Sequence, residues 1–314
     1  MFYLCGMKKA VFLLLILLLS PGVRAQERYQ FAQRDTLALY MDVYEANPGT
    51  ETAFQGHPKP LILFIVGGGF VRMSPGDYVY DWFETLNANG YTVVDIQYRQ
   101  GMKGYKMGKG LSGLAKSSER FYQSQQMAVE DLFDAVRFLI QKKEQLGLDP
   151  DNIVLAGSSA GAITALAAEN QLINGRIPDL PEGFRFRGVM SFAGGIIGQK
   201  GAPKYPQAPC PTLLLHGTAD KAVAYNRLGT LRRGLWGSKY LASKWEKQGF
   251  RNYCIYRFEG IGHDVAAYMN YLWDLEKAFL EQNVILGNPR RVDAAIDDSS
   301  LPTWNQVSVN SIYR

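Results

Sequence analysis

The 314-residue sequence predicts an α/β fold, in which a mostly parallel sheet of about eight strands lies between layers of helices. Short continuous apolar segments alternate along the chain with segments of helical period, a pattern typical of buried parallel strands joined by helices. The sequence contains no heptads or repeats that would indicate another architecture. Hydrophobic residues make up 47% of the chain, which is enough for one large core.

The expected elements follow in chain order. Loose alternation from Phe31 to Tyr44 predicts an opening β-hairpin. The apolar runs predict buried strands at Leu61 to Val66, Tyr91 to Ile96, Ile153 to Ala156, Gly188 to Phe192, Thr212 to Leu215 and Tyr253 to Phe258. The helical patterns predict helices at Tyr78 to Asn89, Ser124 to Gln145, Tyr240 to Gln248 and Val265 to Glu281.

The first 25 residues have the pattern of a secretory signal peptide. Lys8 and Lys9 precede an uninterrupted apolar run from Val11 to Leu19, and Val23-Arg24-Ala25 offers a cleavage site. An uncleaved membrane anchor is the alternative, but the run is short for crossing a bilayer. We therefore expect export to the periplasm or the extracellular space, a mature chain that starts near Gln26, and no stable membrane insertion after cleavage.

The charge of the chain depends partly on this leader. The formal net charge of +5 includes Lys8, Lys9 and Arg24, and without these three residues it is +2. That balance gives no reason to expect a nucleic-acid partner. We expect a catalytic domain over residues 26–287, followed by a polar extension over residues 288–314 that packs over the surface or stays partly disordered.

Two further features leave alternatives open. Cys210 and Cys254 each lie at the start of a predicted strand, so they either form a strained disulfide or remain two buried free thiols. The segment from Gly101 to Tyr122 is long, glycine-rich and basic, and it predicts a loop. That loop is either simply solvated, or it borders a functional site where its lysines attract acidic glycans.

The pentapeptide Gly157-Ser158-Ser159-Ala160-Gly161 lies between a predicted strand and an alanine-rich helical stretch. In that context, G-x-S-x-G forms a tight turn that raises the central serine above the sheet. Small residues on both sides relieve crowding, and the helix N-terminus favours negative charge. We expect Ser159 to be a nucleophile, with a structural serine as the alternative. Ser158, at the x position, is expected to point away from the substrate.

A serine nucleophile needs a base and a residue that orients the base. Of three histidines, His57 is expected at the surface. His263, in a glycine-rich loop after the last predicted strand, is the preferred base, and His216 is the rival. Asp220 follows a strand at the rim where ligands bind in open sheets, and it is the preferred orienting acid over a simple turn aspartate. Asp264 is expected to cap a helix.

Gly67-Gly68-Gly69-Phe70 follows the strand from Leu61 to Val66. Successive glycines let backbone N–H groups approach a substrate oxygen closely. A flexible loop or a phosphate cradle is the alternative, but the sequence lacks the Lys-Ser/Thr ending and the G-x-G-x-x-G spacing of phosphate loops. We therefore expect an oxyanion hole, completed by the N–H of Ala160. No metal or cofactor is needed for this chemistry, and none is expected.

Together these residues resemble the α/β-hydrolase superfamily, and within it the carboxylesterases and hormone-sensitive-lipase-like esterases. The matching segments are Asp42-Val43-Tyr44, Gly67 to Phe70, Gln97-Tyr98-Arg99, Asp149 to Ile153, Gly157 to Gly161, His216 to Asp220 and Gly262-His263. The resemblance implies ester hydrolysis through an acyl-enzyme on Ser159, with Asp220 and His263 completing the triad. It also implies Gly68, Gly69 and Ala160 as oxyanion donors. One departure is Val66, which stands where the family usually has a histidine that shapes the glycine loop.

The expected substrate follows from the short connection between Phe192 and Thr212, which leaves no room for a large lid. A lidless site suits soluble or polymer-linked esters with short acyl or aryl groups. Resemblance to secreted esterases of carbohydrate breakdown suggests acetyl or feruloyl groups on polysaccharide. Two other functions are weighed: a serine peptidase of the prolyl-oligopeptidase type without a propeller, and a non-catalytic binding protein on the same fold.

Overall fold

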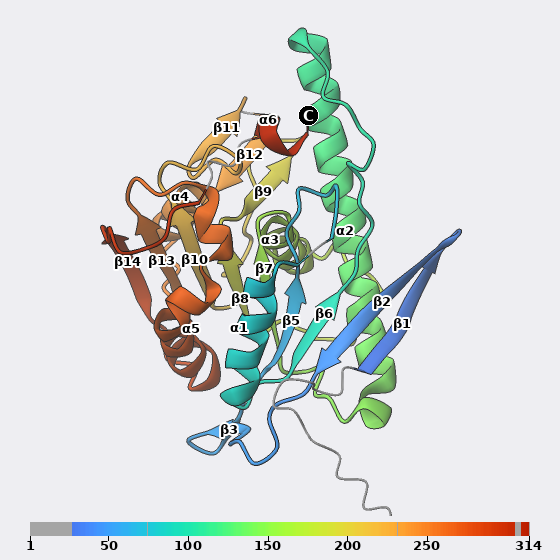
Figure 1. The fold of residues 1–314 in the computed structure, drawn as a ribbon, viewed down its shortest axis with the longest axis vertical. Helices are drawn as coiled ribbons and strands as arrows, with labels where there is room; N and C mark the ends of the chain where they lie inside the picture. The colour runs from blue at the N-terminus through green and yellow to red at the C-terminus, as the bar shows by residue number, and fades with distance from the viewer. Residues whose placement is uncertain (1–26, 74, 231, 305–308, 314) are drawn as a thin grey trace, which may run out of the picture.

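A nine-stranded sheet runs through the molecule, and helices cover both of its faces (Figure 1). The computed structural model describes residues 27–73, 75–230, 232–304 and 309–313, so the predicted signal peptide over residues 1–25 lies outside the described residues. From one edge to the other, the strands are β1 (Glu27–Arg34), β2 (Leu37–Tyr44), β6 (Val93–Ile96), β5 (Leu61–Ile65), β7 (Ile153–Ser158), β8 (Gly188–Phe192), β10 (Thr212–Gly217), β13 (Tyr253–Phe258) and β14 (Arg291–Ile296).

The pairing confirms a mostly parallel sheet. β1 and β2 form the predicted antiparallel hairpin, and β2 also pairs antiparallel with β6. Every pair from β6 to β14 is parallel. β5, β7, β8 and β10 are buried at every residue, which explains their continuous apolar sequences. Because parallel strands end at one edge of the sheet, the loops that follow them meet on one rim.

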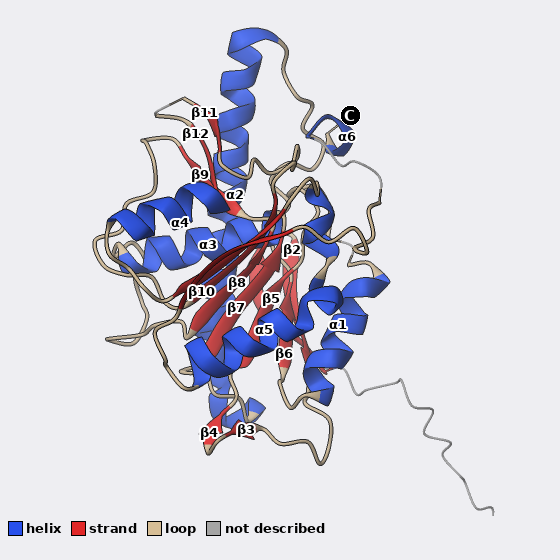
Figure 2. Cartoon of the chain, turned by 90° about the vertical axis from the view of Figure 1, so that its left-hand side faces the viewer, coloured by secondary structure: helices blue, strands red, loops and turns tan. Residues whose placement is uncertain are grey.

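The helices form two layers (Figure 2). α1 (Asp77–Ala88) and α5 (Trp273–Phe279) cover one face, and α2 (Gly110–Leu146), α3 (Ala160–Ile173) and α4 (Ser238–Lys247) cover the other. None of the described helices has the length and hydrophobicity needed to cross a membrane. The expected Val265–Glu281 helix is divided into 3₁₀ turns at His263–Ala267 and Met269–Leu272, α5, and a π-helical turn at Leu280–Ile285.

Short strands complete the fold. β9 (Gly195–Gly198), β12 (Gly234–Gly237) and β11 (Arg227–Gly229) form a small antiparallel sheet beyond the rim of the central sheet. β3 (Ala53–Phe54) and β4 (His57–Pro58) pair at the opposite end, where His57 is exposed as expected. The connection between Phe192 and Thr212 contains β9 and no large lid.

The prediction of a loop from Gly101 to Tyr122 is wrong for its second half, because α2 begins at Gly110. Glycine disfavours helix, so the glycines obscured the helical pattern in the sequence. Gly108 and Gly113 are required by a close backbone contact: a Cβ added to Gly113 would lie 2.3 Å from the carbonyl carbon of Gly108. The chain entering the helix crosses its first turns at that contact, and a side chain would prevent the crossing.

The prediction of a polar extension after residue 287 misses β14, which is the last strand of the central sheet. Its residues alternate between exposed and half-buried, as expected for an edge strand. Two of its three exposed positions carry charges: Arg291 lies 2.5 Å from Glu246, and Asp293 pairs with Arg257 of β13. Charged side chains are common on edge strands because they oppose sheet-to-sheet association, and here they made the segment look like a tail.

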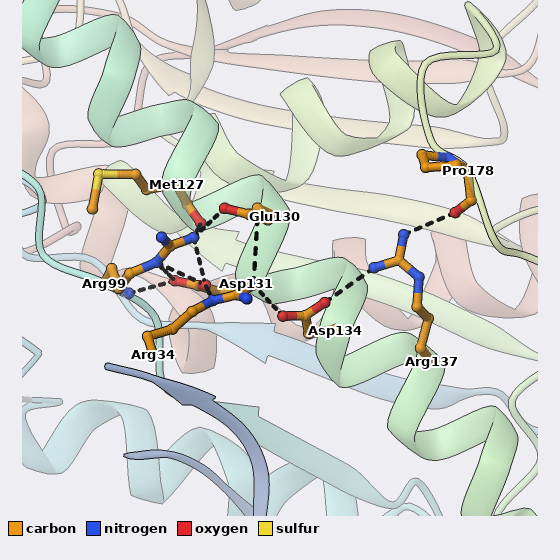
Figure 3. A network of polar contacts seen from close by, with 8 residues as sticks. All are labelled: Arg34, Arg99, Met127, Glu130, Asp131, Asp134, Arg137 and Pro178. Atoms are coloured by element: carbon orange, nitrogen blue, oxygen red, sulfur yellow. Dashed lines mark hydrogen bonds and ion pairs between the residues drawn. The ribbon is translucent and has the colours of Figure 1, made fainter. Parts of the chain in front are cut away.

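A buried carboxylate anchors α2 to the strands beside it (Figure 3). Asp131 accepts hydrogen bonds from the Arg99 backbone N–H at 2.7 Å and from Arg99 Nε at 2.9 Å. Arg34 Nε, from the hairpin, reaches the same carboxylate at 3.3 Å, and Arg34 also pairs with Asp134. The Asp131 side chain is fully buried. These contacts fix the long helix against both β1 and the loop after β6, and so hold its first turns above the rim.

Both described cysteines are free thiols, so the disulfide alternative is wrong. Cys254 Sγ lies 3.8 Å from Asn283 Oδ1, and burial raises the pKa of this thiol to about 11. Cys210 is half-buried, and its backbone N–H donates to Glu169 Oε1 at 2.9 Å.

Candidate active site

The turn between β7 and α3 has the strained geometry that the G-x-S-x-G pattern predicts. Ser159 has φ 51° and ψ −115°, and its N–H donates to the Phe192 carbonyl at 2.8 Å. A Cβ added to Gly161 would lie 1.8 Å from the Ile65 carbonyl oxygen, and one added to Gly157 would lie 2.5 Å from the carbonyl carbon of Gly161. Only glycine fits at both flanks, and strained angles of this kind concentrate at functional sites.

His263 connects the serine to a carboxylate. Its Nε2 lies 2.8 Å from Ser159 Oγ, and its Nδ1 lies 2.7 Å from Asp220 Oδ2. The three residues come from three different strand ends, after β7, β10 and β13. A proton on Nδ1 is held by the carboxylate, which leaves Nε2 free to accept the serine proton. This arrangement can activate a serine hydroxyl for attack on a carbonyl carbon.

Asp220 is held in place as an ionised group. Its Oδ1 accepts hydrogen bonds from the backbone N–H groups of Ala222 at 2.8 Å and Val223 at 2.9 Å. Burial by itself would raise the pKa of Asp220, but hydrogen bonds from His216 and His263 outweigh burial and hold that pKa well below its usual value. The carboxylate therefore stays ionised at neutral pH.

His216, the rival base, lies behind Asp220. Its Nε2 is 3.3 Å from Asp220 Oδ2 and 3.0 Å from the Val223 carbonyl, so the Nε2–H points at two acceptors. Its Nδ1 is 2.8 Å from Ser238 Oγ, and the ring is fully buried. The structure thus makes His216 a support for the carboxylate, a role that the sequence analysis missed. The four-residue spacing from His216 to Asp220 was the feature of the sequence that could have indicated their contact.

The glycine loop lies directly beside the serine turn. Gly67 N–H donates to Ser158 Oγ at 3.1 Å, which accounts for the second serine of the pentapeptide. Gly68 and Gly69 have φ angles of 126° and 65°. Within the described residues, neither of their amides donates a hydrogen bond to the protein. Ala160 is the first residue of α3, where helical N–H groups have no partner in the helix. These three amides are available to a ligand.

Val66 takes the position of the usual histidine without leaving the loop unsupported. Its side chain is buried, and its carbonyl accepts a hydrogen bond from the Tyr98 hydroxyl at 2.9 Å. Tyr98 belongs to the Gln97-Tyr98-Arg99 segment that follows β6, and it is fully buried. A tyrosine from the neighbouring strand end therefore fixes the start of the glycine loop in this chain.

An apolar pocket of about 660 Å³ opens at Ser159. The first turns of α2 form one wall, which confirms that part of the segment from Gly101 to Tyr122 borders the site. The small sheet and α6 (Val309–Ile312) form the others. The apolar side chains that line it include Met107, Leu111, Leu114, Phe121, Ile163, Ile197, Val223, Leu228, Leu235 and Ile312. Lys103, Lys106, Lys109 and Lys116 are exposed and are not among the lining residues.

Parts of the chain are similar to known esterases and lipases. Residues 25–168 match the family model described as "Carboxylesterase family". Esterase B1 of Culex pipiens is 30% identical over 157 residues, which are 50% of this chain and 25% of that protein. Bile salt-activated lipase of Bos taurus is 30% identical over 129 residues, 39% of this chain and 19% of that protein. The chain thus spans about a quarter or less of the length of these two relatives.

Solved structures extend the likeness to most of the chain. A thermophilic esterase from the Planctomycetes species Thermogutta terrifontis, Est2, superimposes with a TM-score of 0.57 and 19% sequence identity. The superposition covers 84% of this chain and 94% of that one, so the two share the fold. Residues 25–168 are thus similar to the carboxylesterase family, and most of the chain shares its fold with a solved esterase structure.

Proposed function

We propose that the protein is a serine hydrolase of carboxylic esters. The observation that carries the proposal is His263, which bridges Ser159 Oγ and Asp220 Oδ2 through its two ring nitrogens at 2.8 and 2.7 Å. The match to the carboxylesterase family supports it. A binding protein on this fold would have no need for a strained serine in contact with a base.

The proposed mechanism uses these residues in two steps. His263 Nε2 takes the proton of Ser159 Oγ as the oxygen attacks the ester carbonyl, and the negative oxygen of the tetrahedral intermediate binds the amides of Gly68, Gly69 and Ala160. When the intermediate collapses, the C–O bond to the alcohol breaks and His263 gives its proton to the leaving oxygen. Water then attacks the acyl-enzyme with His263 again as base, which releases the acid and restores Ser159.

The pocket sets the substrate class that we propose. Its lining beside Ser159 is mostly apolar, so it favours an ester with an apolar acyl or aryl group. The volume of about 660 Å³ exceeds what an acetyl group needs, and it accommodates aryl groups such as feruloyl. Acetyl or feruloyl esters on polysaccharide remain our expectation for the natural substrate. Structures of Est2 have been solved with propionate and with butyrate bound, which makes these acids natural starting points for a chain-length series.

A set of p-nitrophenyl esters tests the proposal. Acetate, butyrate and octanoate should all be hydrolysed, and Ser159→Ala should lower kcat by a factor of at least about 10⁴. Ser158→Ala is the matched control: it removes a neighbouring hydroxyl and should keep measurable turnover. Aminoacyl p-nitroanilides test the peptidase alternative. Turnover of the anilides without turnover of the esters would overturn the proposal.

We also propose that the protein is exported, which rests on the pattern of residues 1–25. Secreted lipase 5 of Gibberella zeae, 23% identical over 180 residues, is named as secreted. Fractionation of cells that express the full chain should place it outside the cytoplasm, with Gln26 or a close neighbour as its first residue. Recovery of the uncleaved chain from the cytoplasm would contradict this proposal.

A further inference from the structure

A segment far along the chain contacts the glycine loop. α6 lies beside the first half of α2 and near the small sheet (Figure 1). Tyr313, which follows α6, lines the same pocket as residues of α2 and of the small sheet. The Tyr313 hydroxyl donates a hydrogen bond of 2.5 Å to the Gly69 carbonyl. Its ring packs edge-on against Phe121 of α2, with centroids 4.9 Å apart and planes at 86°. Tyr313 is thus held from two sides, by the helix wall and by the loop.

Hydrogen bonds hold three successive carbonyls of the loop. The Gly68 carbonyl accepts from Val71 N–H at 3.0 Å, and the Phe70 carbonyl accepts from Met102 N–H at 2.9 Å. Among the described residues, the carbonyl between them, that of Gly69, is bound only by the Tyr313 side chain. A glycine restrains its own dihedral angles least, so a bond from outside the loop matters most at this position.

The geometry around Gly69 fits this contact. A Cβ added to Gly69 would lie 2.7 Å from the Tyr313 hydroxyl oxygen and 2.7 Å from Ile312 Cγ2. Gly69 also has the left-handed φ of 65° that favours glycine. The loop and the α6 segment therefore approach each other as closely as a bare backbone permits. Burial raises the pKa of Tyr313 further above the working range, so its hydroxyl stays a proton donor.

We propose that Tyr313 is a positioning residue for the oxyanion hole. Its hydroxyl fixes the planar peptide unit formed by the Gly69 carbonyl and the Phe70 nitrogen, and it thereby restrains rotation about the Gly69 Cα, which carries the Gly69 amide that receives the substrate oxygen on its other side. This inference rests on the proposed ester hydrolysis. The hydroxyl itself points at the loop carbonyl and takes no part in the chemistry. Its effect should therefore appear in the transition state, where the oxyanion forms, and not in ground-state binding.

Tyr313→Phe tests the proposal, because it removes the hydroxyl and keeps the ring against Phe121. With p-nitrophenyl butyrate, kcat should fall roughly two- to twelvefold, the range to which the net strength of one neutral hydrogen bond converts, while KM stays unchanged. An alkyl trifluoromethyl ketone, which forms a tetrahedral oxyanion on Ser159, should lose affinity by the same factor. The corresponding methyl ketone is a poor oxyanion former and should bind as it does to the wild type.

Tyr268→Phe is the matched control. It removes a hydroxyl that donates to the Pro302 carbonyl at 2.6 Å, in the stretch of chain before α6, without a contact to the glycine loop. It should match the wild type in kcat and in ketone affinity. An equal loss in this control, an unchanged kcat in Tyr313→Phe, or a rise in KM alone would overturn the positioning role. Wild-type turnover that depends on Ser159 is measured first, so failure of the proposed function is recognised separately.

Discussion

Replacing Asp220 with asparagine isolates the role of the carboxylate behind His263. In the wild type, Oδ1 accepts two backbone N–H bonds, from Ala222 and Val223, and Oδ2 accepts from His263 Nδ1 at 2.7 Å. The asparagine oxygen is expected to keep the two backbone bonds, because an NH₂ group at that position would face two donors. Its NH₂ group then faces His263 Nδ1, while His216 Nε2–H loses the carboxylate and keeps the Val223 carbonyl as its acceptor at 3.0 Å.

This change acts on the tautomer of the base. A donor opposite Nδ1 favours the ring with its proton on Nε2, the nitrogen that lies 2.8 Å from Ser159 Oγ. In that form Nε2 cannot accept the serine proton. We expect kcat to fall by roughly 10⁴, or about 5 kcal/mol of transition-state stabilisation, the scale of the same substitution in serine protease triads. KM should change little, because the pocket wall is untouched.

The assay compares kcat for p-nitrophenyl butyrate in the wild type, Asp220→Asn and Asp264→Asn. Asp264 is next to His263 in sequence, but its Oδ1 accepts the Trp304 backbone N–H at 2.7 Å and so serves the local fold. Asp264→Asn keeps an oxygen for that bond and should retain most of the activity. The reasoning is refuted if both variants lose activity equally, or if Asp220→Asn keeps more than about a tenth of the wild-type kcat.

Two predictions concern stability. Burial, together with the charge of Asp42, raises the pKa of Asp95 to about 8, so the folded chain holds a proton that the unfolded chain loses near pH 4. The free energy of unfolding should therefore fall as pH rises from about 4 to 8, by at most about 1.4 kcal/mol per pH unit. In Asp95→Asn, the urea midpoint should change less with pH across this window than in the wild type. Equal pH dependence in the two proteins would contradict the raised pKa of Asp95. Asp131→Asn leaves Arg34 and Arg99 without their shared buried carboxylate, and should lower the free energy of unfolding by about 3 kcal/mol in urea titrations, whereas a loss below about 0.5 kcal/mol, typical of surface positions, would refute it.

The parallel core and the serine turn could be predicted because their signals are local. Continuous apolar runs marked β5, β7, β8 and β10, since strands covered on both faces carry no polar alternation. Gly157 and Gly161 marked the turn, since no other residue fits the clearances there. The order of strands along the chain also placed Asp220 and His263 on the same rim, and the structure brings both to Ser159.

Features that depend on distant contacts escaped prediction. α2 begins earlier than its sequence suggests, because the glycines that weaken helix propensity serve a crossing between Gly108 and Gly113. β14 is an edge strand whose charged face resembled a tail. The role of His216 depends on which group it meets, and a histidine near an aspartate in sequence can serve either as base or as support.

The sequence by itself determined the fold class, the serine turn and the chain order of the three polar residues, because each follows from backbone sterics or from the burial period of a single element. Only the tertiary structure decided that His263 meets the serine while His216 holds Asp220 from behind. It also decided that Tyr313 reaches Gly69, a contact between residues separated by 244 positions. Side-chain partners across such distances are set by how the layers pack, and no local pattern in the sequence encodes that packing.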